Sequence, residues 1–165
     1  MGRVYSLSDD RGQFSAFNHL PGWEYHKNMM GLPHVFLKTT KKKKHSSFSV
    51  TFTGQKIVLK EDKLKKKLEG YTQGRKEWAK KKKVKIKKFH KYEFTQTKQK
   101  MRIHIIGFDY STPFLKNIKE KSIYLNCPDD SIIHFKAVLL PEHHKDETEL
   151  INFIKSVMTC KLNQI

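Results

Sequence analysis

Lysine side chains dominate the middle of this sequence and define the chemistry that the chain can offer. Between Lys38 and Arg102 there are 24 Lys and Arg residues against 5 Asp and Glu, a net charge of +19, although the whole chain carries only +18. A lysine ammonium group contacts phosphate as a point charge and reads no base sequence. This concentration of positive charge predicts a polyanionic partner: nucleic acid, an anionic membrane surface or an acidic protein.

We predict that the partner is nucleic acid, either DNA or RNA, bound through backbone phosphates without clear base-sequence specificity. Aromatic side chains between the lysine runs could stack bases; the alternative is that Trp78 and Phe89 are core residues. His104 and His134 are expected on the outward sides of strands, where they could contact phosphate. The sequence has no RNP, KH or zinc-finger pattern. The predicted binding residues are Lys41, Lys42, Lys43, Lys44, Lys65, Lys66, Lys67, Arg75, Lys80, Lys81, Lys82, Lys83, Lys85, Lys87, Lys88, Lys91, Arg102 and Trp78.

Two alternative functions use the same lysines differently. The first is a membrane-surface or adaptor module, because Gly2 with Ser6 fits the N-myristoylation pattern. A polybasic patch is the usual second membrane signal beside a single acyl chain. The second is a protein-interaction scaffold, in which the N-terminal arm and Trp23 would contact a partner. Lysine runs can also act as nuclear import signals, so we expect an intracellular, nuclear protein.

No reaction, metal or cofactor is predicted from the sequence. Residues 61–63, Glu-Asp-Lys, match a fragment of a nuclease carboxylate site, but the one candidate partner, Asp109, is distant in the chain. No glycine-rich phosphate loop, HExxH or GxSxG motif occurs. Cys127 and Cys160 are isolated, which suggests neither a disulfide framework nor a four-ligand zinc site. No segment approaches the roughly 18 to 20 apolar residues that a membrane span needs.

The lysines at 83–88 are predicted to lie on a folded strand rather than in a free tail. Val84 and Ile86 share one parity, and Lys85 and Lys87 have the other. This alternation is typical of a strand with one buried face. The pattern slips by one residue at 87–88, which predicts a β-bulge. The basic surface should therefore be built into a sheet.

Further elements follow from the same reasoning. Residues 1–34 are expected to form an irregular N-terminal arm that packs some of its aromatic residues on the domain. A short helix should occupy part of 61–82, interrupted by Gly70 and Gly74. A hairpin is expected over 47–60, with its turn at 54–55. The other expected strands are 34–38, 100–108, 122–126 and 131–140, the last two joined by a turn at 128–130.

The last predicted element is an amphipathic helix. Leu150, Phe153, Ile154, Val157 and Met158 share one helical face, and the spacing of residues 146 and 149 resembles a capping box. The predicted fold is α+β, with a mostly antiparallel curved sheet or small partly open barrel, a short middle helix and this closing helix. In element order it resembles a pleckstrin-homology-type barrel. Residues 35–165 should form a single basic domain.

Overall fold

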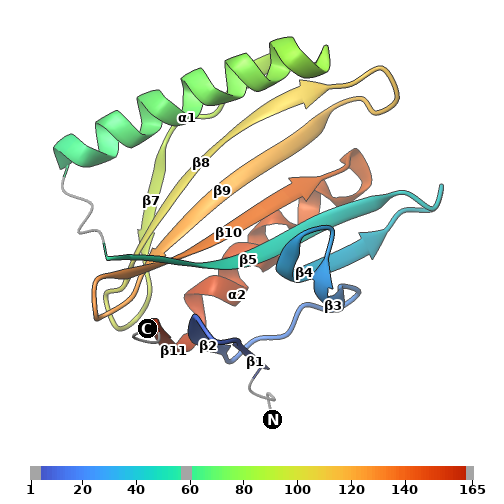
Figure 1. The fold of residues 1–165 in the computed structure, drawn as a ribbon. Coiled ribbons are helices and arrows are strands. Elements are labelled where there is room, and N and C mark those ends of the chain that lie inside the picture. The colour runs from blue at the N-terminus through green and yellow to red at the C-terminus, as the bar shows by residue number, and fades with distance from the viewer. Residues whose placement is uncertain (1–4, 57–60, 163–165) are drawn as a thin grey trace.

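The computed structural model describes residues 5–56 and 61–162, and most of its strands belong to one large antiparallel sheet (Figure 1). The strand order is β3-β4-β5-β10-β9-β8-β6, and β7 pairs with β8 beside β6. The sheet does not close into a barrel, so the broad α+β class is confirmed and the partly open barrel is not. The bounds are β3 Glu24–Met29, β4 Leu32–Thr39, β5 His45–Lys56, β6 Lys85–Phe89, β7 Glu93–Gln96, β8 Arg102–Ser111, β9 Ile118–Asn126 and β10 Ser131–Leu139.

A second, three-stranded sheet covers part of one face of the large sheet. It consists of β1 (Tyr5–Ser8), β2 (Gly12–Ala16) and β11 (Val157–Leu162). After β10 the chain forms a 3-10 helix (Pro141–Asp146) and then α2 (Glu147–Lys155), which packs between the two sheets (Figure 1).

The main hydrophobic core fills the space between the two sheets and α2. Phe14 of β2 contacts Phe135 of β10 with ring centroids 5.3 Å apart, and Phe135 stacks on Phe48 of β5 at 5.7 Å. Phe153 of α2 lies 5.5 Å from Phe14. These four rings are almost completely buried, and burying an aromatic side chain of this kind contributes roughly 1.5–3 kcal/mol.

The other face of the large sheet carries α1 (Glu61–Lys82), which lies over β8 and the neighbouring strands (Figure 1). A second, smaller core forms beneath it, around Phe108 and Tyr110 of β8. Tyr71 and Trp78, two helical turns apart on α1, point into this core. One long helix therefore replaces the predicted short helix and glycine-containing loop. Gly70 and Gly74 lie at exposed positions of this helix, and the packing of Tyr71 and Trp78 outweighs their low helix propensity.

Several sequence predictions are confirmed. The pairing of β6 with β8 shifts register between Ile86 and Lys88, so the predicted bulge is present. The turn between β9 and β10 spans the expected residues, and Leu150, Phe153 and Ile154 are buried on α2.

Other predictions are wrong. The described part of 1–34 contains β1, β2 and β3 rather than irregular chain, although its aromatic Phe14 and Trp23 do pack on the domain. β5 runs through 54–55 and pairs with β4 and β10, so the turn is not there; the predicted return strand at 57–60 lies outside the described residues. The helix is not the last element: it ends at Lys155, and Val157 and Met158, predicted on its apolar face, belong to β11. Asp146 makes no side-chain cap and instead bonds Lys38 at 2.6 Å.

The two cysteines also depart from expectation. Cys127, the residue that follows β9, and Cys160 of β11 form a disulfide that ties the small sheet to the large one. Disulfides persist in oxidising compartments and are rare in the cytosol and nucleus. The intracellular, nuclear location therefore stays a prediction, and this bond counts against it.

Candidate functional site

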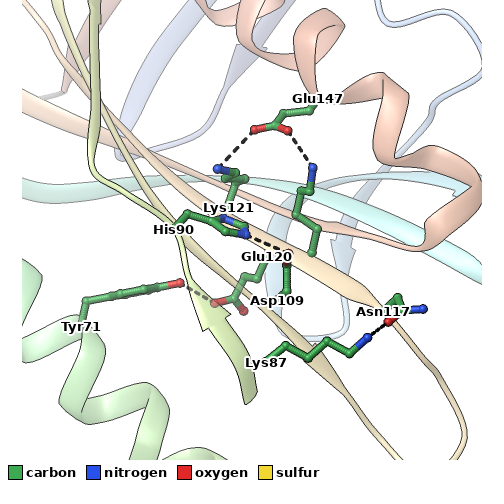
Figure 2. Close-up of polar contacts among 9 residues, drawn as sticks. Tyr71, Lys87, His90, Asp109, Asn117, Glu120, Lys121 and Glu147 are labelled. Carbon is green, nitrogen blue, oxygen red and sulfur yellow. Dashed lines mark hydrogen bonds and ion pairs between the residues drawn. The ribbon is translucent and has the colours of Figure 1, made fainter. Parts of the chain in front are cut away.

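The position of α1 is set by one buried carboxylate on the sheet beneath it. Glu120 of β9 is 2% exposed and accepts a hydrogen bond from the Tyr71 hydroxyl at 2.9 Å (Figure 2). It also forms ion pairs with Arg75 at 3.2 Å and with Lys136 of β10 at 3.3 Å. Burial and the neighbouring carboxylate raise the pKa of Tyr71, so the phenol remains a donor. α1 is thus fastened to the sheet at its middle.

Aromatic packing continues this attachment toward the C-terminal end of α1. The Arg75 guanidinium lies 4.0 Å from the centroid of the Trp78 ring, a cation–π contact. Trp78 meets Tyr110 edge-on at 5.3 Å, and Phe89 of β6 stacks on Phe108 at 5.6 Å. Trp78 and Phe89 are therefore partly buried residues that pack against the smaller core, and each has a ring face already occupied, by Arg75 and by Phe108 respectively.

α1 ends in a tight turn that leads directly into the edge strand β6. The Val84 N–H donates to the Ala79 carbonyl at 2.9 Å, and Lys83 takes a left-handed conformation with φ 55°. The turn exposes all four lysines of 80–83. β6 continues with Lys85 and Lys87 exposed, and the Lys87 ammonium donates to the Asn117 side chain in the β8–β9 loop (Figure 2).

The β8–β9 loop, residues 112–117, is closed by its own hydrogen bonds. The Thr112 N–H donates to the Leu115 carbonyl at 2.7 Å, and the Leu115 N–H donates to the Thr112 hydroxyl at 2.8 Å. Leu115 packs against the smaller core. The Phe114 side chain between them is 87% exposed. An ordered loop thus holds a large apolar side chain in solvent.

We call this region the basic end of the molecule. The C-terminal end of α1, the start of β6 and the β8–β9 loop meet there (Figure 1). No ion pair joins any of its lysines to a carboxylate of residues 5–56 and 61–162 whose side chain is described. The charges are therefore uncompensated by close partners. The basic end consists of Lys80, Lys81, Lys82, Lys83, Lys85, Lys87, Phe114 and Lys116.

The remaining predicted binding residues do not join this surface. The turn 41–44 lies at the same end of the large sheet but beyond β9 and β10, where the Lys41 N–H bonds Glu142. The Lys67 ammonium lies over the Tyr124 ring at 4.2 Å, and Arg75 is tied to Glu120. Arg102 begins β8 at the opposite end of the sheet. Lys66, Lys88 and Lys91 are exposed elsewhere on α1 and the β6–β7 edge, and the Lys65 side chain lies outside the described set.

The histidines predicted to contact phosphate are not suited to it. His104 is buried, with its ring stacked on Tyr92, and His134 stacks on Tyr124 with centroids 4.6 Å apart. Burial lowers the pKa of both rings, for His134 to about 4. They are therefore neutral near pH 7 and add no charge to the surface.

One polar pair and one three-residue ion cluster lie on the face of the sheet away from α1. His90 bonds Asp109 at 2.8 Å, and Glu147 at the start of α2 accepts both Lys119 and Lys121 (Figure 2). Burial, followed by the charge of Lys121, lowers the pKa of His90. Among the residues that the structure describes, no three metal-ligating side chains come together. Residues 61–63 form the first turn of α1, and their side chains lie outside the described set.

Comparisons with known proteins define the fold. No family model matches the chain, and no curated protein matches its sequence. A solved structure of PsbP from Synechocystis sp. PCC 6803 superposes with a TM-score of 0.59 at 10% identity, covering 96% of this chain and 94% of that one. A Pseudomonas aeruginosa protein of unknown function gives 0.47 at 9% identity, covering 96% and 98%.

These findings correct the predicted function. The fold is similar to that of a cyanobacterial PsbP, and this similarity gives no support for nucleic-acid binding. The predicted base-stacking residue Trp78 packs against the smaller core, and the predicted lysines are dispersed over several surfaces. The nucleic-acid-binding prediction is wrong.

Proposed function

We propose that this protein is a peripheral membrane-binding module that docks its basic end onto an anionic lipid surface. The observation that carries the proposal is Phe114, which is 87% exposed on a hydrogen-bonded loop among lysines that have no described acidic partner. Sequence reasoning found the lysines but not Phe114. No described helix is long and apolar enough to cross a membrane, so contact would be with the surface.

The lysines and Phe114 would make different contributions to the free energy of membrane binding. A lysine close to an anionic leaflet contributes about 1 kcal/mol, and the contribution is screened by salt. The basic end carries seven exposed lysines in addition to Phe114. Its phenyl ring would enter the boundary between headgroups and acyl chains, and full burial of such a ring contributes roughly 1.5–3 kcal/mol. Because Thr112 and Leu115 already order the loop, little conformational entropy is lost on docking.

A single projecting ring within a charged surface suits a lipid bilayer better than an acidic protein. Protein–protein interfaces have a broad apolar centre with charged residues depleted from it. In the loop the exposed residues beside Phe114 are Pro113, Lys116 and Asn117, and Leu115 packs inward against the smaller core. The myristoylation pattern is not needed for this mode; Gly2 lies outside the described residues, and β1 lies on the other side of the large sheet from α1 (Figure 1).

Vesicle sedimentation tests the proposal. Wild-type protein should bind vesicles of phosphatidylcholine with phosphatidylserine but not phosphatidylcholine alone, and binding should weaken as salt rises. Phe114→Ala should weaken binding by about tenfold or more, and so should replacing Lys80 to Lys83 by glutamine. Met30→Ala is the matched control, because Met30 is 68% exposed on the β3–β4 turn, outside the basic end.

The outcomes separate clearly when each variant is first shown to be folded by circular dichroism. Equal binding to neutral and anionic vesicles would exclude the electrostatic part of the proposal. Undiminished binding by both the Phe114 and the lysine variants would exclude the basic end as the docking surface. No binding to any vesicle would leave the acidic-protein alternative in its place.

A further inference from the structure

A groove of about 780 Å³ lies at the other end of the large sheet from Phe114. One wall is the turn between β7 and β8, residues 96–99. The opposite wall is the junction of α2 and β11, residues 155–158, together with Asn152 and the exposed segment that follows β2, residues 17–18. A volume of this size is typical of a ligand-binding site.

Hydrogen bonds fix both walls of the groove. The Phe17 N–H donates to the Ser156 carbonyl at 3.0 Å, and the Asn18 N–H donates to the Ser156 hydroxyl at 3.1 Å. Across the groove, the Thr97 N–H donates to the Met101 carbonyl at 3.0 Å, and the Met101 N–H donates to the Thr97 hydroxyl at 3.1 Å. The groove is therefore preformed.

Each wall also ends in a strand with an unpaired edge. Within residues 5–56 and 61–162, β11 pairs only with β2, and β7 pairs only with β8. An unpaired strand edge presents a row of backbone N–H and C=O groups that an extended chain can pair with. Gln96 at the end of β7 and Val157 and Met158 at the start of β11 line the groove, so a ligand there could pair with these strand ends in an extended conformation.

The side chains of the groove define what that ligand carries. Phe17 is 52% exposed and Met158 is 49% exposed, so two large apolar side chains face solvent there. Lys98 and Lys155 are exposed on opposite walls, and none of the described residues that line the groove is acidic. An extended segment with apolar side chains for Phe17 and Met158, and with carboxylates for the two lysines, complements all of these features.

We propose that this groove binds an extended acidic peptide, which adds as a strand to the free edge of β11. Its apolar side chains contact Phe17 and Met158, and its carboxylates pair with Lys98 and Lys155. Backbone pairing supplies affinity and the side-chain contacts supply selectivity. This peptide site is separate from the basic end and does not depend on membrane docking.

Selection from a displayed library of random 12-residue peptides against the immobilised whole chain tests the proposal without a known partner. Enriched peptides should contain Asp or Glu together with spaced apolar residues. A synthetic copy of the most enriched peptide, labelled with fluorescein, is then titrated by fluorescence anisotropy. The double variant Lys98→Glu and Lys155→Glu should weaken its binding by about tenfold or more. A peptide N-methylated at alternate amides should also lose binding, because it cannot pair with a strand edge.

The matched control is the double variant Lys80→Glu and Lys81→Glu, which reverses the same number of charges at the basic end and should leave peptide binding unchanged. Circular dichroism and thermal unfolding confirm that both double variants fold. Enrichment of peptides without acidic residues would overturn the proposal. So would peptide binding that survives the groove variant, is lost in the control variant, or tolerates N-methylation.

Discussion

Replacing Glu120 by glutamine should detach α1 from the sheet more easily than any change on the exposed face of the helix. Glutamine keeps the shape of the side chain but removes the charge that Arg75 and Lys136 share. Breaking a buried ion pair costs about 3–5 kcal/mol, and a hydrogen bond to a charged group contributes about 1.5–3 kcal/mol. The Lys136 side chain is 38% exposed, so its contact with Glu120 is screened by solvent and counts for little. The Arg75 side chain, 19% exposed, and the Tyr71 hydroxyl carry most of the effect. We therefore expect Glu120→Gln to lower the free energy of unfolding by about 2–4 kcal/mol.

Urea unfolding measures this change, and the two tryptophans allow the two cores to be followed separately. Trp78 lies in the core beneath α1, and Trp23 lies in the main core. In a Trp23→Phe background, fluorescence reports on the α1 core alone, and hydrogen exchange of residues 66–82 should accelerate in Glu120→Gln. Glu77→Gln is the control, because Glu77 is exposed on α1 and should change stability by less than about 0.5 kcal/mol. If Glu120→Gln matched this control, the buried carboxylate would not be what holds α1.

Three further changes test other features of the fold. Replacing both Cys127 and Cys160 by serine should lower the free energy of unfolding by about 3–4 kcal/mol, because the bond joins residues 33 apart. A double variant with the same urea midpoint as the oxidised wild-type protein would refute this. His134 has a folded-state pKa of about 4 against an ordinary 6.5, so the folded state binds fewer protons than the unfolded chain. The free energy of unfolding should therefore decrease as the pH is lowered from about 6.5 to about 4. His134→Phe should flatten this part of the pH profile measured by urea unfolding. Gly74→Ala should raise the free energy of unfolding by about 1 kcal/mol, since nothing lies near the added methyl group; a lower thermal midpoint would contradict it.

Local patterns were predictable because strand alternation is visible in neighbouring residues. The β6 strand and its bulge follow from the spacing of Val84, Ile86 and the lysines between them. The length of α1 could not be predicted in this way, because Gly70 and Gly74 each cost about 1 kcal/mol in a helix and so suggested an interruption. Packing of Tyr71 and Trp78 on β8 outweighs that cost. Such tertiary packing cannot be inferred from the sequence of the helix alone.

Long-range pairing limited the rest. β2 pairs with β11, whose residues lie about as far away in sequence as the chain allows, so no neighbouring pattern marked the N-terminal segment as strand. For the same reason, the charge of the basic end could be predicted from the sequence, but the residues that come together there could not. The charge of 80–83 is evident in the sequence, but the distance of 41–44 from it depends on strand order. In the sequence Phe114 looks like an ordinary loop residue, and its 87% exposure on a hydrogen-bonded loop is evident only in the structure.

The position of β6 at the edge of the large sheet has a consequence for how the protein behaves at high concentration. An unpaired edge strand can recruit the same strand of another copy and start aggregation. Lys85, Lys87 and Lys88 on β6, together with its bulge, oppose this by charge repulsion and by interrupting the register. Neutralising these lysines should therefore promote self-association. The same ammonium groups that face an anionic surface would keep free copies of the protein apart.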